Sequence, residues 1–233
     1  MIILARRLMP VAIVVALTAY LPAAPASSAM HACANSSISI KADEPVDHHD
    51  ICNCAWDALA FFDRLELDLT YPLVIEVAPN LPDWMSETAV GCYQKEEQKV
   101  FVLTFPAFEK REEWFGVPVN RSMYCSLVTH EVAHAVASCS FTISEPTIHA
   151  EEYAAYVAMF AMMNPVLRAR ILMEYPGTDF DSELEINEIT YLFDPMRFGV
   201  AAFRLYLKKE YGDAFLLKVF SGSALSNSLD DFP

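Results

Sequence analysis

The spacing of apolar residues predicts one helix followed by a small β-sheet in the first half of the chain. Residues 51–65 carry apolar side chains at helical spacing, and Asp50 is of a type that caps helix N-termini. Residues 72–77 form a short apolar run closed by Pro79, which is typical of a strand. Residues 89–93 and 99–105 predict two strands of a hairpin, joined by the polar residues 94–98.

From residue 122 onwards the pattern is helical. No proline or glycine interrupts residues 122–138, and their uncharged flanks are those of a buried helix. Further helices are predicted over 146–163, 165–175, 182–193 and 195–211, with a last short helix after Asp213. This order predicts an α+β fold in which a small N-terminal sheet packs on the 122–138 helix and the C-terminal half is mostly helical.

The two ends of the chain are predicted to lie outside the folded domain. Residues 1–29 combine two early arginines, an apolar run over 8–21 and small residues at 27–29, the pattern of a cleaved signal peptide. The alternatives are an uncleaved membrane anchor, for which the run is short, and a lipoprotein site at Cys33, which its neighbours match poorly. Residues 30–49 predict a flexible arm, 50–221 a single domain, and 222–233 a frayed tail.

The negative net charge disfavours some classes of binding partner. The formal net charge is −15, and it becomes −17 once the signal peptide and its two arginines are removed. Such a surface argues against nucleic acid and anionic membranes, and it fits a cationic partner or simple solubility. We expect an exported protein, periplasmic or secreted, that has no membrane attachment after signal cleavage, and the oligomeric state stays open.

Six cysteines follow residue 29, at positions 33, 52, 54, 92, 125 and 139. In an exported chain this even number predicts up to three disulfides. Cys52 and Cys54 are too close in sequence for an unstrained bridge. Cys125 and Cys139 lie 14 positions apart on one helix, about 21 Å at its rise, so they cannot pair with each other. We expect these last two to join their helix to other elements.

The strongest chemical signal is the motif H-E-x-x-H at residues 130–134. On a helix, residues four apart share a face, so His130 and His134 can bind one metal ion. Glu131 is then placed to act on a metal-bound water, which is the arrangement of a Zn²⁺ hydrolase. The alternative interpretation is a core helix with two hydrogen-bonded histidines.

A catalytic zinc site needs a third protein ligand, and the helix after Pro146 supplies the candidates His149, Glu151 and Glu152. The metzincin pattern fails, because Ser140 stands where its third histidine belongs. Residues 123–163 instead resemble the gluzincin branch of zinc metallopeptidases, which carries its ligand glutamate on a following helix.

The gluzincin resemblance implies Glu152 as the ligand, 18 positions after His134. It departs from that family at Ala154 and Ala155, where most members have an Asp or Asn soon after the glutamate. Helical spacing puts Glu152 on a face with polar atoms, whereas Glu151 shares an apolar face. We favour Glu152 and keep Glu151 as the rival. The whole mature chain also resembles a family of uncharacterised exported bacterial proteins, which implies no activity.

These residues predict a zincin-like metallopeptidase acting on a peptide or protein substrate. Glu131 acts as general base on a zinc-activated water, and Tyr156 is the first candidate to stabilise the oxyanion, with His149 and Tyr191 as others. By analogy with zincins, a substrate pairs with a hairpin strand such as 100–105.

The sequence also allows three other interpretations. The first is a non-catalytic zincin-like domain that acts in binding or inhibition. The second is a structural zinc site, which normally has four Cys or His ligands. The third is a second metal cluster at residues 48–54, where oxidised cysteines and a capping Asp50 are the better explanation.

Overall fold

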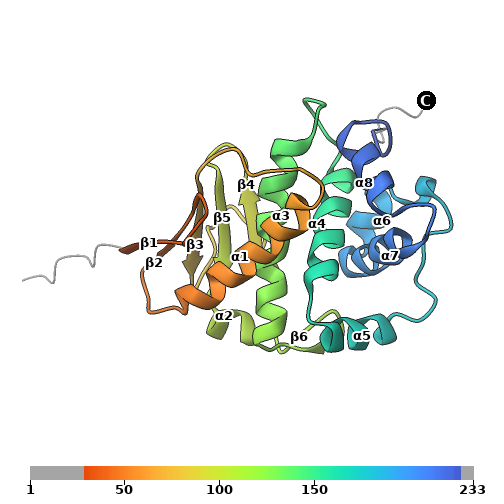
Figure 1. Cartoon of the computed structure of the whole chain (residues 1–233). Coiled ribbons are helices and arrows are strands. Elements are labelled where there is room, and N and C mark those ends of the chain that lie inside the picture. The colour runs from red at the N-terminus through yellow and green to blue at the C-terminus, as the bar shows by residue number, and fades with distance from the viewer. Residues whose placement is uncertain (1–28, 227–233) are drawn as a thin grey trace, which may run out of the picture.

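A five-stranded mixed sheet forms one side of the molecule in the computed structural model, which describes residues 29–226 (Figure 1). Its strands are β1 (Ala29–Ala32), β2 (Ile38–Ala42), β3 (Leu73–Ala78), β4 (Gly91–Gln94) and β5 (Lys99–Leu103). They lie in the order β1-β2-β3-β5-β4. The three inner strands are parallel, and both edge strands are antiparallel to their neighbours. The predicted hairpin is therefore present as β4 and β5.

The N-terminal segment differs from the prediction of a flexible arm over 30–49. Residues 38–42 alternate in burial, with Ile38 and Ile40 almost fully buried, and they pair in parallel with β3. A disulfide from Cys33 to Cys52 fixes this segment to the next helix. The polar residues Ser39 and Lys41 alternate with the two isoleucines and form the less buried face of a short strand, so the segment resembles a polar arm in sequence.

Three long helices build the core, and the first two of them lie against the sheet. They are α1 (His48–Asp63), α3 (Arg121–Ser140) and α4 (Ile148–Met162). In Figure 1, α1 crosses in front of α3, and α4 runs beside α3 on the side away from the sheet. Helix α1 begins before the predicted residue 51, because the side chain of Asp47, and not that of Asp50, caps it.

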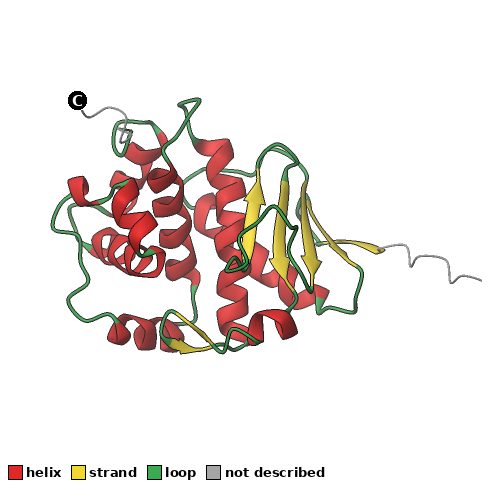
Figure 2. Ribbon diagram, turned by 180° about the vertical axis from the view of Figure 1, so that it is seen from behind, coloured by secondary structure: helices red, strands yellow, loops and turns green. Residues whose placement is uncertain are grey.

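The helices that follow α4 form the other side of the molecule, as the view from behind shows (Figure 2). The segment between the sheet and α3 holds the short helix α2 (Phe105–Glu109) and a two-stranded ribbon of β6 (Glu113–Trp114) and β7 (Val117–Pro118). After α4 come α5 (Pro165–Glu174), the 3-10 turn η1 (Glu183–Glu185), α6 (Glu188–Phe193), α7 (Pro195–Leu207) and α8 (Gly212–Phe220). The α+β prediction, with a small N-terminal sheet and a helical C-terminal half, is confirmed.

One predicted helix is split in two. Residues 182–193 form the turn η1 and then α6, because Asn187 starts a new helix with a reciprocal cap. Its side chain accepts from the backbone N–H of Thr190 at 3.1 Å, and the Thr190 hydroxyl accepts from the N–H of Asn187 at 3.3 Å. Helix α7 begins at Pro195 with Asp194 as its cap, as predicted, but ends at Leu207.

Two disulfides are present in the described residues, Cys33–Cys52 and Cys54–Cys125. The second joins α1 to α3, as expected for Cys125, whereas Cys92 and Cys139 are free thiols. Two bridges are compatible with an oxidising, exported environment. Within residues 29–226, no helix has the length and apolar character needed to cross a bilayer. The predicted signal peptide lies outside the described residues except for Ala29, and so does the tail from residue 227.

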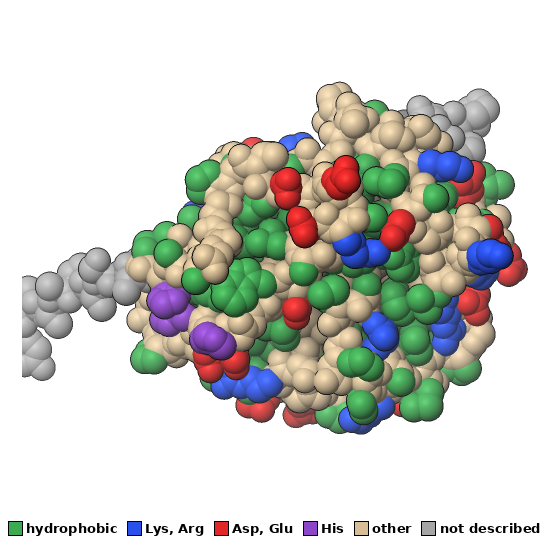
Figure 3. Space-filling view, viewed as in Figure 1, with side chains coloured by type: hydrophobic (Ala, Val, Ile, Leu, Met, Phe, Trp, Pro, Cys, Tyr) green, Lys and Arg blue, Asp and Glu red, His purple; other side chains and the backbone are tan. Residues whose placement is uncertain are grey.

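Charged side chains of both signs are interspersed on the face seen in Figure 3. The core beneath it is continuous from the sheet through α1, α3 and α4 to α7 and α8. The middle of α3 is therefore buried on all sides, apart from the cleft described next.

Candidate metal centre

Helix α3 carries the H-E-x-x-H motif through the centre of the molecule. The side chain of Asn120 caps it by accepting from the N–H of Met123 at 3.0 Å. Its apolar flanks pack against α1, α4 and the sheet, which leaves His130 only 7 % exposed and Glu131 only 6 % exposed. Polar side chains at such depth need partners or a ligand.

The structure brings His130, His134 and Glu152 together. The two Nε2 atoms lie 3.2 Å apart. Glu152 places Oε2 at 3.6 Å from the Nε2 of His130 and Oε1 at 3.6 Å from that of His134. Ligands of a tetrahedral zinc ion, with bonds of about 2.0–2.1 Å, lie about 3.3 Å from one another. The three donor groups therefore fit one metal ion with little movement, and they are the only such group of three among the described residues.

The electrostatics of this trio also fit a cation. Burial, and then His134, lowers the pKa of His130 well below its usual value, and burial lowers the pKa of His134 to about 4. Both imidazoles are therefore neutral near pH 7, when their Nε2 lone pairs and the Glu152 carboxylate face one another. Within residues 29–226 the Oε2 of Glu152 has no hydrogen-bond donor. Such an arrangement is costly unless a cation completes it.

Tyr191 orients the carboxylate of Glu152. Tyr191 lies on α6, 39 residues after Glu152 in the chain, and its hydroxyl donates a hydrogen bond of 2.9 Å to Oε1 of Glu152. Hydrogen bonds of this kind fix the direction of a metal ligand. Burial raises the pKa of Glu152 to about 7, although the Tyr191 hydrogen bond opposes the change. The sequence offers Tyr191 only as a distant oxyanion candidate, and the structure gives it this different contact.

Tyr156 lies behind the first histidine. Its ring packs on that of His130 with 4.5 Å between centroids, and the residue lines the same cleft. The ring fits because Gly199 on α7 has no side chain: a Cβ there would lie 2.6 Å from Cδ1 of Tyr156. The Tyr156 hydroxyl has no hydrogen-bond partner among the residues that the structure describes, so it is free to serve a ligand in the cleft.

Glu131 lies against the edge strand β4. A Cβ on Gly91 would be 2.7 Å from its Oε1, and the nearby backbone N–H of Tyr93 acts to lower the pKa of its carboxyl. Burial, and then the charge of Glu152, raises the pKa of Glu131 well above its usual value. Sequence reasoning missed Gly91 and Tyr93. The only available signal was the glycine inside a strand pattern, which often marks a close approach.

The two rival ligands lie elsewhere. Glu151 is on the wall of the cleft but outside the group of three, and burial raises the pKa of its carboxyl. His149 is buried beside Thr147, whose hydroxyl is 3.2 Å from its Nε2, and it is not among the residues lining the cleft. His149 is therefore neither in the group of three nor on the wall of the cleft.

The proposed second cluster at residues 48–54 is not present. Both of its cysteines are in disulfides, and His48 instead packs on His31 with ring centroids 4.6 Å apart. Asp50 donates its backbone N–H to the Asp47 cap at 3.0 Å.

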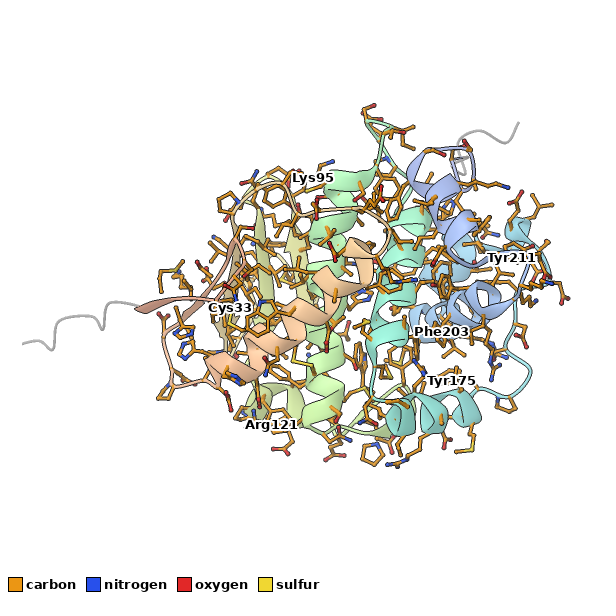
Figure 4. All side chains as sticks on the ribbon, in the orientation of Figure 1. Cys33, Lys95, Arg121, Tyr175, Phe203 and Tyr211 are labelled. Carbon is orange, nitrogen blue, oxygen red and sulfur yellow. A yellow bond between two sulfur atoms is a disulfide. The ribbon has the colours of Figure 1, made fainter. Side chains whose placement is uncertain are left out.

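A cleft of about 860 Å³ opens onto the trio. Strand β4, Trp84, Trp114, Glu151 and Tyr191 line it. Lys95 also lines it and lies in the turn of the β4–β5 hairpin; this residue is labelled in the upper part of Figure 4. The expectation that a strand at 100–105 receives the substrate needs correction: β5 lies between β3 and β4, so the free edge beside the trio belongs to β4.

Comparison with known proteins now adds one finding. A family model described as a family of unknown function, DUF6639, matches residues 38–229. This chain belongs to the DUF6639 family. The matched region of this DUF6639 protein runs from β2 through α8 and so contains the trio, Glu131 and the whole cleft. No curated protein matches the chain, and no solved structure does.

Proposed function

We propose that this DUF6639 protein is an exported, zincin-like zinc metallopeptidase of the gluzincin type. The observation that carries the proposal is the convergence of His130, His134 and Glu152 from two helices on one point, with Glu131 beside it. Two histidines and one carboxylate leave a fourth zinc position open, which is the ligand set of a catalytic site and not of a structural one.

Zinc, when bound to these three residues, supplies an activated water and an electrophile for a peptide carbonyl. Glu131 holds the proton taken from the water and delivers it to the leaving amine. Its depth favours this role, because burial and the neighbouring Glu152 both work against a permanently charged carboxylate. Tyr156 has a free hydroxyl in the same cleft and is the candidate to donate a hydrogen bond to the oxyanion.

The cleft favours an extended peptide as the substrate. Within residues 29–226, no strand pairs with the outer side of the edge strand β4, so a peptide can pair there by strand addition. Exposed Trp84, with 61 % of its surface accessible, and Trp114 offer apolar contact area for side chains. The acidic net charge of −15 favours neutral or cationic peptides over acidic ones.

A specific observation supports the alternative of a non-catalytic zincin-like binding domain. Within the described residues, the buried Nδ1 of His130 has no hydrogen-bond partner. Metal-binding histidines usually donate that second nitrogen to a carboxylate or carbonyl, which strengthens the site. A binding domain tolerates a weaker metal site than a peptidase does.

Cleavage of a fluorogenic peptide library by the zinc-loaded mature protein separates the two. The proposal predicts cleavage that chelation abolishes, and a loss of about 100-fold or more in the Glu131→Gln variant, which keeps its zinc. Cleavage that persists unchanged in Glu131→Gln comes from a contaminant and contradicts the proposal. Zinc-loaded wild type that binds peptides but cleaves none favours the binding domain.

A further inference from the structure

Gly91 lies closer to Glu131 than any other residue type allows. A Cβ at this position would be 2.7 Å from Oε1, 2.8 Å from Cγ and 3.0 Å from Cδ of Glu131. The backbone of Gly91 gives no other reason for a glycine, because it is not among the residues with positive φ. What position 91 requires is the absence of a side chain, and the group occupying that space is the predicted general base.

The free edge of β4 faces the same carboxylate. The carbonyl of Val90 accepts from the N–H of Leu103 at 3.1 Å, so the backbone carbonyl of Val90 points towards β5. In an antiparallel pair, alternate residues point their backbone groups away from the partner strand, which applies here to Gly91 and Tyr93. The N–H of Tyr93 accordingly lies on the outer side of β4 near Glu131, and its nearness acts to lower the pKa of that carboxyl.

The side chain of Tyr93 ties β4 to the helix that carries Glu131. Its hydroxyl is 2.9 Å from the hydroxyl of Ser138 on α3 and also hydrogen-bonds to the hydroxyl of Tyr71. Tyr71 in turn donates to the backbone carbonyl of Ala135 at 3.1 Å. These contacts hold the strand to α3 within one or two turns of Glu131, so strand and helix keep a fixed separation.

We propose that β4 is a positioning strand for Glu131: Gly91 makes room for the carboxylate, and the Tyr93–Ser138–Tyr71 contacts set the distance between strand and helix. The catalytic meaning of this arrangement rests on the proposed function. A general base must lie within about 3 Å of the proton it takes, so a displacement of even 1 Å matters. Gly91 and Tyr93 are thus positioning residues, and neither touches the metal trio.

The test is a double-mutant cycle on thermal unfolding of the full mature protein, run in chelator so that it needs no activity. Gly91→Ala is expected to lower Tm by about 3 °C or more, as an overpacked site does. In a Glu131→Ala background the new methyl group enters vacated space, so the same substitution is expected to cost little or to raise Tm. In a Glu131→Gln background the side chain remains, and the full cost is expected to persist.

An equal fall in Tm in the wild-type, Glu131→Ala and Glu131→Gln backgrounds overturns the proposal, because the cost of a side chain at position 91 is then independent of Glu131. Should Gly91→Ala alone fail to fold, recovery of a folded Gly91→Ala/Glu131→Ala protein supports it, and no recovery overturns it.

Kinetics supply the second readout. Gly91→Ala and Tyr93→Phe are expected to keep zinc and to lower kcat by tenfold or more at a nearly unchanged KM. Unchanged kcat in both refutes the positioning role but leaves the peptidase standing. If the double-mutant cycle shows coupling between Gly91 and Glu131 but the protein cleaves no peptide, the proposed arrangement of β4 and Glu131 stands. The proposed peptidase function is then refuted.

Discussion

Replacing Glu152 with glutamine is expected to stabilise the metal-free protein. The carboxylate is 12 % exposed, and among residues 29–226 only one of its oxygens has a hydrogen-bond donor, the Tyr191 hydroxyl. Glutamine keeps the size of the side chain and an oxygen for Tyr191. Its amide can donate to the Nε2 of a neutral His130, which is 3.6 Å from the oxygen it replaces.

The magnitude follows from the pKa of Glu152, which burial raises from 4.5 to about 7. A carboxyl that ionises less readily when folded destabilises the folded state as pH rises through this interval. Below about pH 4.5 the cost is absent, and above about pH 7 it is complete, at about 3 kcal/mol. For a domain of this size that corresponds to a rise of about 6–12 °C in Tm for Glu152→Gln.

Thermal unfolding in chelator, compared at about pH 8 and about pH 5, measures this effect. The Tm advantage of Glu152→Gln is expected to be large at the higher pH and to shrink towards zero at the lower one. Glu151→Gln is the matched control, and because its side chain is more exposed it should change Tm less. A Glu152→Gln protein that is less stable than wild type at the higher pH would refute the reasoning, since the carboxylate would then have a favourable partner.

Three further predictions concern the same site and its support. Tyr191→Phe is expected to weaken zinc binding about 10-fold or more, because the Glu152 carboxylate loses the donor that orients it, and competition with a chromogenic chelator measures this. The apparent zinc affinity of wild type is expected to rise about tenfold for each pH unit up to about pH 7 and then to level off, because Glu152 must lose its proton while both histidines are already neutral. A pH-independent affinity below that value would contradict this ligand set. Removing the Cys54–Cys125 disulfide by Ser substitutions is expected to cost about 4 kcal/mol in urea unfolding, because it closes a loop across a separation of 71 residues; an unchanged midpoint would show that it does not brace α3.

The sequence predicts most of this fold because its signals are local. Helices α3, α4, α5 and α7 follow from caps, prolines and uninterrupted apolar spacing, each within one segment. The β-strand over residues 38–42 escapes prediction because its pairing partner, β3, begins more than thirty residues later. Its two isoleucines carry too little pattern to reveal a strand without that partner.

In the candidate site, too, the residues that follow from local signals can be predicted, and those that depend on long-range packing cannot. Two histidines and a glutamate within five residues indicate a pair of metal ligands and a base, because helical spacing alone brings the two histidines to one face. The choice between Glu151 and Glu152 depends on how α4 crosses α3, since adjacent residues on a helix point about 100° apart. Local periodicity favours Glu152, but only the packing of the two helices brings its carboxylate to the histidines.

Contacts from distant segments cannot be seen in the sequence. Tyr191 reaches Glu152 from a short helix that Asn187 begins, and Gly91 meets Glu131 from across the sheet edge. The sequence offers Tyr191 only as a distant oxyanion candidate and Gly91 only as a glycine inside a strand, and neither signal identifies the contact that the residue makes. A tyrosine and a strand glycine acquire meaning only when tertiary structure places them beside a buried carboxylate.

The most direct test of the metal centre is zinc content after equilibration in a zinc buffer, for wild type, Glu152→Ala and Glu151→Ala. The account predicts about one zinc per chain in wild type and in Glu151→Ala, and loss of zinc in Glu152→Ala. Zinc retained in Glu152→Ala but lost in Glu151→Ala would show that the neighbouring carboxylate is the ligand. A wild-type protein that takes up no zinc would contradict the account as a whole.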